Sequence, residues 1–222
     1  MDPVKEEEVD IDIDLDEHQS LNIQDNLLIR QTSVVAKLKI VLVGDSGVGK
    51  SFLLNTYLSR FVDTINSTGR VENSSSTSSA EILLEGNPVH VTFIDTQDSD
   101  SLRQKAYKDA DLILLVFSLA AISSLDHIEG KWIPELQRCA PGVGYILVGS
   151  QLDRWDDEDE KHVMEGQPQD IALKLKCAVH LVRPTDNEGV ITCFTDALGQ
   201  AYASNLANIR RNKPTAECCI FL

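Results

Sequence analysis

The sequence has no run of eighteen or more apolar residues, the length at which a helix can cross a lipid bilayer. It also has no basic start followed by an apolar stretch, so no secretory signal is expected. Cysteines are few, five in 222 residues, and their spacing matches neither disulfide pairs nor a metal site. These absences indicate a protein of a reducing compartment such as the cytosol, long enough for one well-packed domain with additional tails.

Basic residues are also scarce: 20 Lys and Arg stand against 35 Asp and Glu, a net charge of −15. A first acidic cluster lies near the N-terminus and comprises Asp2, Glu6, Glu7, Glu8, Asp10, Asp12, Asp14, Asp16 and Glu17. A second cluster, DDEDE, occupies residues 156–160. This balance argues against nucleic-acid binding, because the phosphates would be repelled. The negative net charge does not argue against a small anionic ligand that is held locally by a few donors.

Residues 1–35 form an N-terminal extension in which acids alternate with apolar residues, as in EEEVDIDIDLDEH. One interpretation is a solvated, disordered tail. The other is a short linear motif that adds as a strand to the sheet edge of a partner or docks on a basic surface.

The pattern beyond residue 36 predicts an α/β fold. Six strands are expected at 37–44, 80–86, 89–95, 111–118, 145–150 and 178–182, and helices near 50–60, 121–138, 168–177 and 190–211. Four strands are almost entirely apolar, which is typical of a mostly parallel sheet with helices on both faces. The turn EGNP at 85–88 predicts one hairpin, and the Ser/Thr/Asn-rich segment 66–80 a mobile loop.

The stretch GDSGVGKS follows the first strand and fits the pattern G-x-x-x-x-G-K-[ST] of a phosphate-binding loop. Its glycines let backbone N–H groups surround a phosphate, and the following helix adds its dipole. Lys50 places a positive charge on the terminal phosphates, and the hydroxyl of Ser51 is a ligand for Mg²⁺. The residues of this predicted loop are Gly44, Asp45, Ser46, Gly47, Val48, Gly49, Lys50 and Ser51.

Two carboxylates at strand ends suggest which nucleotide binds. Asp153 follows the strand in LVGSQLD, where it can accept hydrogen bonds from guanine N1 and N2. Asp95 in FIDTQDSD is placed to hold Mg²⁺ through water. Together with the phosphate loop, these motifs resemble the Ras superfamily of small GTPases, and residues 117–153, which include KWIPEL, look like the Rho branch.

The resemblance covers about residues 37–222 and implies a P-loop NTPase G domain that binds GTP or GDP with Mg²⁺. The expected organisation is an extension at 1–35, a G domain at 36–208 and a C-terminal tail at 209–222. No arginine-bearing lid follows the phosphate loop, which disfavours a P-loop kinase.

The chain departs from the family at the positions linked to hydrolysis. Ser46 replaces a usual glycine, where a side chain crowds the γ-phosphate and the entry of an arginine finger. The motif D-T-A-G-Q reads D-T-Q-D-S, so Ser99 replaces the glutamine that orients the attacking water. Both changes resemble the Rnd subgroup of Rho proteins and predict slow or absent hydrolysis. Gln97 is the nearest residue that could replace the missing glutamine.

The nucleotide contacts are also altered. Asp98 replaces a glycine near the γ-phosphate, where it either weakens GTP binding or points its carboxylate to solvent. The base pocket is assigned to Gln151, Asp153, Arg183 and Pro184. Gln151 replaces the family's lysine, and Pro184 lacks an N–H for guanine O6, so reduced affinity is expected.

The Mg²⁺-binding threonine of the first switch is ambiguous. Counting forward from the phosphate loop gives Thr68, counting back from Asp95 gives Asn73, and Thr77 is a further candidate. The family's effector motif is not recognisable, so effector and regulatory proteins that bind the switch loops should differ from those of common Rho proteins.

The last four residues, C-I-F-L, fit a prenylation motif. Cys219 is the expected prenylation site, and Cys218 is a candidate for palmitoylation as the second membrane signal. The leading hypothesis is therefore a monomeric Rho-like switch at the cytoplasmic face of a membrane, with deficient hydrolysis. The alternatives are a nucleotide-independent pseudoGTPase scaffold and an ordinary GTPase that cycles between GDP and GTP.

Overall fold

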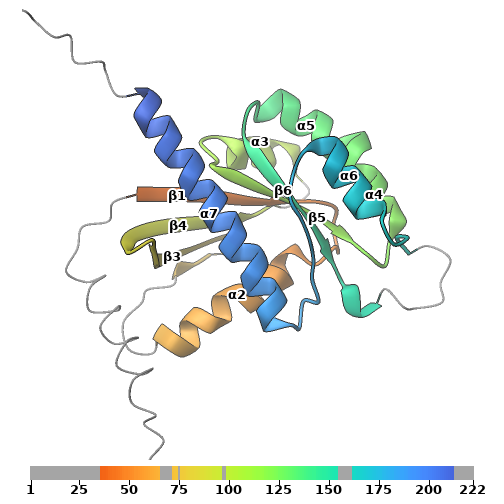
Figure 1. Ribbon diagram of the computed structural model, residues 1–222, viewed down its shortest axis with the longest axis horizontal. Coiled ribbons are helices and arrows are strands. Elements are labelled where there is room, and N and C mark those ends of the chain that lie inside the picture. The colour runs from red at the N-terminus through yellow and green to blue at the C-terminus, as the bar shows by residue number, and fades with distance from the viewer. Residues whose placement is uncertain (1–35, 66–71, 75, 97–98, 155–161, 213–222) are drawn as a thin grey trace, which may run out of the picture.

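The computed structural model describes residues 36–65, 72–74, 76–96, 99–154 and 162–212, arranged as one central sheet between two layers of helices (Figure 1). The strands are β1 (Ala36–Val43), β2 (Glu72–Asn73), β3 (Thr77–Leu84), β4 (Asn87–Asp95), β5 (Leu112–Ser118), β6 (Gly144–Ser150) and β7 (Val179–Leu181). Their order in the sheet is β2-β3-β4-β1-β5-β6-β7. Only the β2–β3 and β3–β4 pairs are antiparallel.

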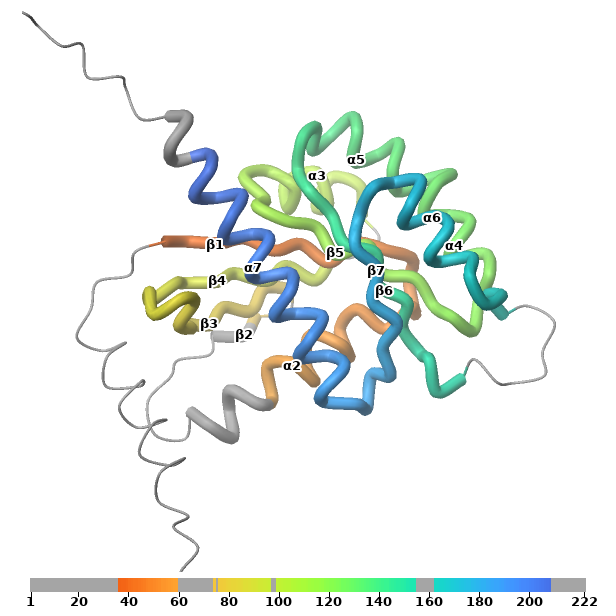
Figure 2. Tube along the Cα trace, in the orientation of Figure 1, coloured from red at the N-terminus to blue at the C-terminus, as the bar shows by residue number. Residues whose placement is uncertain are grey.

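Helices cover both faces of the sheet (Figures 1 and 2). One layer holds α2 (Lys50–Ile65) and α7 (Asn187–Asn212), which lie side by side. The other holds α3 (Asp100–Tyr107), α4 (Ile122–His127), the π-helical turn η1 (Ile128–Trp132), α5 (Ile133–Cys139) and α6 (Gln167–Leu175). A short 3₁₀ turn, η2 (Leu152–Arg154), follows β6. None of the helices in the described ranges is both long and apolar enough to cross a membrane.

The period-two pattern of the strands divides the apolar side chains between two cores. In β1, Leu38, Ile40 and Leu42 pack against the α2 and α7 layer, whereas Val41 and Val43 pack against the other layer. In the first core the rings of Tyr57 and Phe194 stack with centroids 4.3 Å apart. A sheet covered on both faces requires apolar residues at consecutive positions, which is the pattern in β5.

The structure confirms the expected fold class: the six predicted strands form the mostly parallel sheet, and the two-residue β2 extends it at one edge. The predicted hairpin is also confirmed, because β3 and β4 pair across Glu85 and Gly86, whose φ angles of 51° and 76° are both positive.

Two expectations about local structure were wrong. Residues 72–73 and 77–80, predicted as part of a loop, belong to β2 and β3, since the pairing of β2 with β3 and of β3 with β4 supplies the order that their polar side chains do not suggest. Helix α3 had not been predicted, because its sequence DSLRQKAY carries few apolar residues.

The N-terminal extension 1–35 and most of the tail 209–222, including Cys218 and Cys219, lie outside the described residues.

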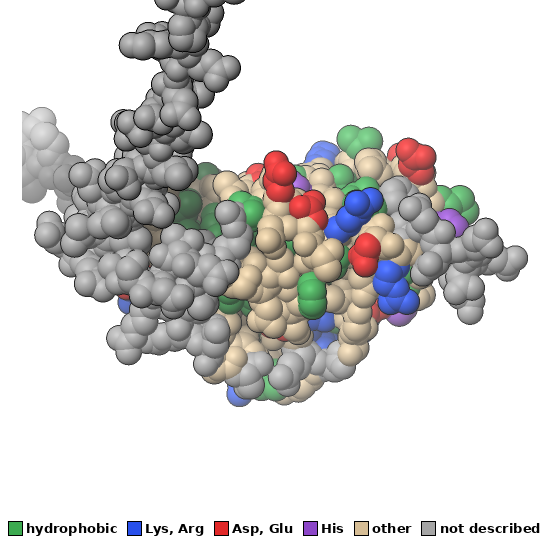
Figure 3. Space-filling model, turned by 90° about the horizontal axis from the view of Figure 1, so that it is seen from below, with side chains coloured by type: hydrophobic (Ala, Val, Ile, Leu, Met, Phe, Trp, Pro, Cys, Tyr) green, Lys and Arg blue, Asp and Glu red, His purple; other side chains and the backbone are tan. Residues whose placement is uncertain are grey.

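Charged side chains of both signs are interspersed on the face shown in Figure 3, and apolar side chains appear there as separate small areas. The N-terminal acidic cluster and the DDEDE segment lie outside the described residues. The described surface in this view therefore carries no continuous field of one sign that would repel an anionic ligand.

Candidate nucleotide-binding site

The loop between β1 and α2 has a backbone conformation that requires glycine at several positions. Gly47 and Gly49 have φ angles of 79° and 95°, in the left-handed region that favours glycine. A Cβ on Gly44 would lie 2.0 Å from the carbonyl oxygen of Val116, so the loop can pass β5 only with glycine there. The sequence pattern for a phosphate loop is therefore matched by a turn that bends around the N-terminus of a long helix.

Lys50 begins α2 and is buried beneath this loop. Its Nζ donates hydrogen bonds to the carbonyl oxygens of Gly44 (2.8 Å) and Asp45 (2.7 Å). These bonds keep the ammonium group inside the ring of backbone formed by residues 44–50. An anion bound in the loop would meet this charge together with the first N–H groups of α2.

Ser51 and Asp95, the two predicted Mg²⁺ ligands, are brought into direct contact. The Ser51 hydroxyl donates a short hydrogen bond to Oδ2 of Asp95 at the end of β4. The other carboxylate oxygen, Oδ1, is buried and has no hydrogen-bond partner among the described residues. A buried oxygen of this kind needs a donor, a water or a cation. The pair therefore fits Mg²⁺, which proteins usually hold by one or two carboxylates together with the substrate's phosphates.

The end of β6 is tied to the phosphate loop by two side chains. The hydroxyl of Ser150 donates to the carbonyl oxygen of Val48. Gln151 has a positive φ of 59°, and its Nε2 donates to the carbonyl oxygen of Gly47 at 3.2 Å. Ser118 at the end of β5 donates to Oε1 of the same glutamine at 2.6 Å. Gln151 therefore bridges the strand end and the loop, a role that the sequence did not reveal.

The remaining residues assigned to the base come together beside this bridge. Asp153 is exposed in η2, and the N–H of its neighbour Leu152 bonds to the carbonyl oxygen of Val182 at 3.3 Å. This contact brings η2 next to Arg183, which is exposed, and Pro184, which is buried. The carbonyl oxygen of Pro184 accepts a 3.0 Å hydrogen bond from the hydroxyl of Thr56 in α2.

Asp45, predicted as part of the phosphate loop, directs its carboxylate to the α4–η1 segment. Its Oδ1 accepts a hydrogen bond from the indole of Trp132 at 3.1 Å and lies 3.9 Å from Nζ of Lys131. Its Oδ2 lies 2.6 Å from Nδ1 of His127. The backbone of Asp45 thus shapes the loop while its side chain anchors the loop to the neighbouring helices.

Helix α3 is held against α5 by a buried ionic cluster. The guanidinium of Arg103 makes two bonds to Glu135, of 2.9 Å and 3.0 Å, and Tyr107 donates to the same carboxylate at 2.6 Å. Burial alone would raise the pKa of Glu135, but the bonds from Arg103 and Tyr107 and the charge of Arg103 lower it below its ordinary value. Burial and the bond to Glu135 raise the pKa of Tyr107.

The two serines linked to hydrolysis are both exposed. Ser46 lies in the phosphate loop between Asp45 and Gly47. Ser99 is the N-cap residue of α3, where its carbonyl oxygen accepts bonds from the N–H groups of Leu102 and Arg103. Its hydroxyl lies 3.2 Å from that of Ser101 and makes no capping bond.

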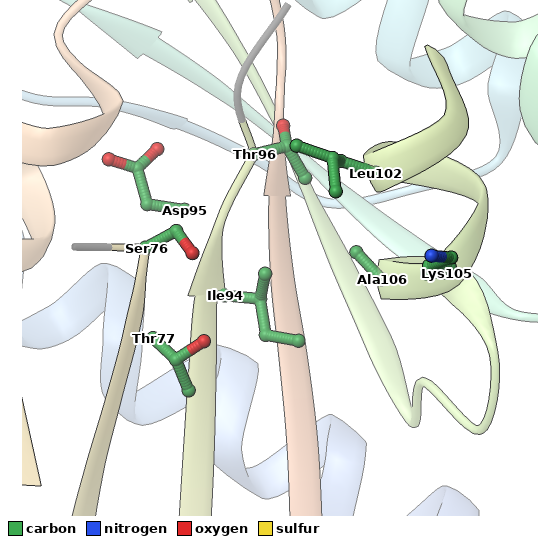
Figure 4. A pocket seen from close by; sticks show the side chains of 8 residues that line it. All are labelled: Ser76, Thr77, Ile94, Asp95, Thr96, Leu102, Lys105 and Ala106. Atoms are coloured by element: carbon green, nitrogen blue, oxygen red, sulfur yellow. The ribbon is translucent and has the colours of Figure 1, made fainter. Parts of the chain in front are cut away.

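A hollow of about 220 Å³ opens between the sheet edge and α3 (Figure 4). Ser76 and Thr77 line it from the side of β3, and Leu102 and Lys105 from α3. Thr77 thus lies near Asp95 but within a regular strand, paired with Ile94. Asn73 belongs to β2, and Thr68, Gln97 and Asp98 lie outside the described residues.

The fold and this loop define a P-loop nucleotide-binding protein of the α/β class, because a glycine turn, a buried lysine and a Ser–Asp pair meet at the carboxyl ends of parallel strands. The family model described as "Ras family" matches residues 39–203, most of the chain. The protein therefore belongs to the Ras family. It is a small GTPase, a GTP-binding switch of a family that binds guanine nucleotides with Mg²⁺.

Proposed function

We propose that this Ras-family protein is a Rho-like switch with slow or deficient GTP hydrolysis, held at the cytoplasmic face of a membrane by a C-terminal lipid. The observation that carries the hydrolysis proposal is the pair of exposed serines, Ser46 and Ser99. A serine hydroxyl at residue 99 is too short to orient an attacking water as a glutamine does. The side chain at residue 46 crowds the space needed by the γ-phosphate and an arginine finger.

Nucleotide binding itself is supported by the intact phosphate loop. The Ser51 hydroxyl and, through water, the carboxylate of Asp95 would hold Mg²⁺. The bound ion would supply positive charge to the phosphates of the nucleotide. Lys50 supplies a buried positive charge to the same phosphates, and the N–H groups of residues 47–51 donate to them. Asp153 is assigned to guanine N1 and N2, beside the loop that contains Arg183 and Pro184.

The Rho-like assignment is supported by the contacts of the KWIPEL segment at residues 131–136. Trp132 binds Asp45 of the phosphate loop, and Glu135 binds Arg103 of α3. The segment therefore connects the phosphate loop with α3. Both of these polar side chains make contacts that join α3 and the phosphate loop to the segment.

Partner proteins are proposed to bind at the switch surface, with the protein as a monomer. Leu102 on α3 is 51% exposed beside the hollow that Lys105 also lines. An apolar group flanked by a cation favours a partner that offers an apolar side chain and a carboxylate.

The first test is the identity of the nucleotide in freshly purified full-length protein, released by denaturation and separated by anion-exchange chromatography. We expect GTP near one equivalent that persists for hours in Mg²⁺. Accumulation of GDP would instead indicate an ordinary GTPase, with Gln97 as the residue to examine. Protein that takes up neither nucleotide would indicate a nucleotide-independent scaffold.

The second test restores the family residues. In single-turnover assays, Ser99→Gln combined with Ser46→Gly should raise the hydrolysis rate towards the intrinsic rate of Ras, on the order of 10⁻⁴ s⁻¹. Ser101→Gln is the matched control, because Ser101 is also exposed and its hydroxyl contacts that of Ser99. Equal rates for the double variant and the control would contradict the proposed cause.

Membrane attachment is tested separately. Cys219→Ser should move the protein from the membrane fraction to the supernatant of fractionated cells, because one lipid and a second signal together give stable anchoring. Cys218→Ser should give a partial shift. Unchanged membrane association of Cys219→Ser would overturn the lipid proposal without affecting the nucleotide proposal.

A further inference from the structure

Phe52 is an aromatic residue in an unusual place. Its side chain is 52% exposed, whereas the other aromatic rings whose exposure the structure describes are buried or half-buried. Single apolar side chains on a surface are common and need no explanation by themselves. Phe52, however, directly follows the predicted Mg²⁺ ligand Ser51 and lies in the first turn of α2, at the rim of the phosphate loop.

The contact made by Thr56 shows towards which segment the Phe52 side of α2 is turned. Residues four apart in a helix lie on the same face, so Phe52 and Thr56 form one ridge. The Thr56 hydroxyl donates to the carbonyl oxygen of Pro184. That face of α2 is therefore turned towards the segment of Arg183 and Pro184, the proposed base-binding loop.

Phe52 is the N-terminal member of this ridge. Side chains on a helix lean towards its N-terminus and cover the turn before their own Cα. The ring of Phe52 therefore extends towards the phosphate loop on the side where the base-binding loop approaches. A nucleotide whose phosphates lie in residues 44–51 and whose base reaches Asp153 and Pro184 must pass this position with its sugar or base.

We propose that the ring of Phe52 packs against the nucleoside part, the ribose or the base, of the bound guanine nucleotide. This inference rests on the proposed nucleotide binding and adds a binding residue to that site. Gln151 donates to Gly47 and accepts from Ser118, so its amide is engaged in tying the strand end to the loop. Phe52 supplies apolar contact surface where the lysine of the family is missing.

The contact should support affinity and not base selectivity. Any base or sugar presents an apolar face to an aromatic ring, so stacking discriminates little between bases. Selectivity for guanine remains with the carboxylate of Asp153, whose hydrogen bonds depend on the donors of the base. Removal of the ring should therefore weaken the binding of GDP and of inosine diphosphate by similar factors.

The first experiment measures the release of radiolabelled GDP from the full chain in Mg²⁺ after addition of excess unlabelled GDP. Phe52→Ala should release GDP about tenfold faster than the wild type, as expected for loss of one ring–nucleoside contact. Phe52→Tyr keeps the ring and should release GDP at the wild-type rate. Leu173→Ala is the matched control, since Leu173 is 76% exposed on α6, in the opposite helix layer.

The second experiment observes the contact directly. In the wild type, nuclear Overhauser effects should connect ring protons of Phe52 with H8 or H1′ of bound GDP, and they should be missing in Phe52→Ala. This signal does not depend on how the substitution affects the stability of α2. It therefore decides the proposal even if Phe52→Ala folds poorly.

The outcomes separate this inference from the function on which it rests. A wild type that binds no guanine nucleotide overturns both. A wild type that binds GDP, together with unchanged release from Phe52→Ala and no ring-to-nucleotide signal, overturns only the role of Phe52. Faster release from Phe52→Ala and from Leu173→Ala alike would also overturn it, because the effect would not be specific to the site.

Discussion

The indole Nε1 of Trp132 donates a 3.1 Å hydrogen bond to the carboxylate of Asp45, and the guanidinium of Arg103 lies over the ring of the same tryptophan, 5.1 Å from its centroid. One side chain thus contacts both the phosphate loop and α3. Because Arg103 is in turn fixed by Glu135, a continuous set of contacts runs from residue 45 to α3.

The first prediction concerns this tryptophan. Trp132→Phe keeps an aromatic ring but removes the indole donor, so it should lower the free energy of unfolding by about 1–3 kcal/mol. Lys174→Gln is the control, because the side chain of Lys174 is 69% exposed, its ion pair with Glu129 lies at the surface, and such pairs contribute little. Urea denaturation monitored by circular dichroism measures both. Equal losses in the two variants would show that the indole bond is unimportant.

The second prediction concerns the acid stability conferred by Glu135. Its pKa is below the ordinary value of 4.5, so its carboxylate stabilises the folded state fully above that value, and this contribution is lost as the pH falls through the lower pKa of the folded state. Glu135→Gln should cost about 3 kcal/mol at pH 7, since Arg103 would lose the charge of Glu135 and keep the exposed Asp100 as a charged partner. As the pH falls below 4.5, the difference from the wild type should shrink.

Melting temperatures measured across this pH range test the prediction. Glu188→Gln, which alters an exposed carboxylate in the first turn of α7, serves as the control and should leave the melting temperature nearly unchanged at every pH. A difference between Glu135→Gln and the wild type that stays constant from pH 7 to about pH 3 would contradict the proposed ionic cause.

The third prediction concerns the bridge made by Gln151. Gln151→Ala removes the bonds to Gly47 and Ser118, so the amide protons of residues 44–49 should exchange with solvent about tenfold faster. Gln200→Ala provides a matched control, because Gln200 is exposed and its amide bonds only within α7, to Asp196. Hydrogen exchange followed by mass spectrometry gives the rates for both. Unchanged exchange in Gln151→Ala would mean that the bridge does not order the loop.

The fourth prediction concerns the thiol of Cys193. Burial raises its pKa to about 12, and the negative charge of Asp196 acts in the same direction. At pH 8 its thiolate fraction is on the order of 10⁻⁴, so iodoacetamide should not modify it in the native protein. Peptide mapping compares it with Cys139, which is partly exposed. Modification of Cys193 at the rate of Cys139 would show that α7 opens readily.

The sequence predicted the parts of the fold that depend on regular apolar patterns. Strands such as β5 and β6 are mostly apolar runs, and the glycines around Lys50 indicate the phosphate loop. Both features are recognised from residues that are close together in the sequence. The sequence could not reveal α3, because Arg103, one of its buried side chains, is held by Glu135 from a distant helix. A charged residue gives no sign of burial until its partner is known.

The candidate site also combines residues that motifs predict with residues whose roles depend on distant contacts. Ser51 and Asp95 were predicted as Mg²⁺ ligands from separate motifs; the structure brings them into direct contact, and their binding of Mg²⁺ stays a prediction. The roles of Gln151, Trp132 and Thr56 depend on contacts between residues more than 80 positions apart in the chain, which no local pattern encodes. The guanine contacts themselves stay a prediction.

Because η1 is a π-helical turn, the positions of α4 and α5 between β5 and β6 depend on the exact number of residues in that turn. A π turn holds one residue more than an α turn, and consecutive residues of a helix are separated by about 100° of rotation. Deletion of one residue within Ile128–Trp132 would therefore rotate α4 against α5 and carry His127 away from Asp45, while Glu135 stayed on Arg103. Among natural variants of this chain, substitutions at the exposed Gly130 and Lys131 of η1 should accordingly be tolerated far more often than single-residue gaps.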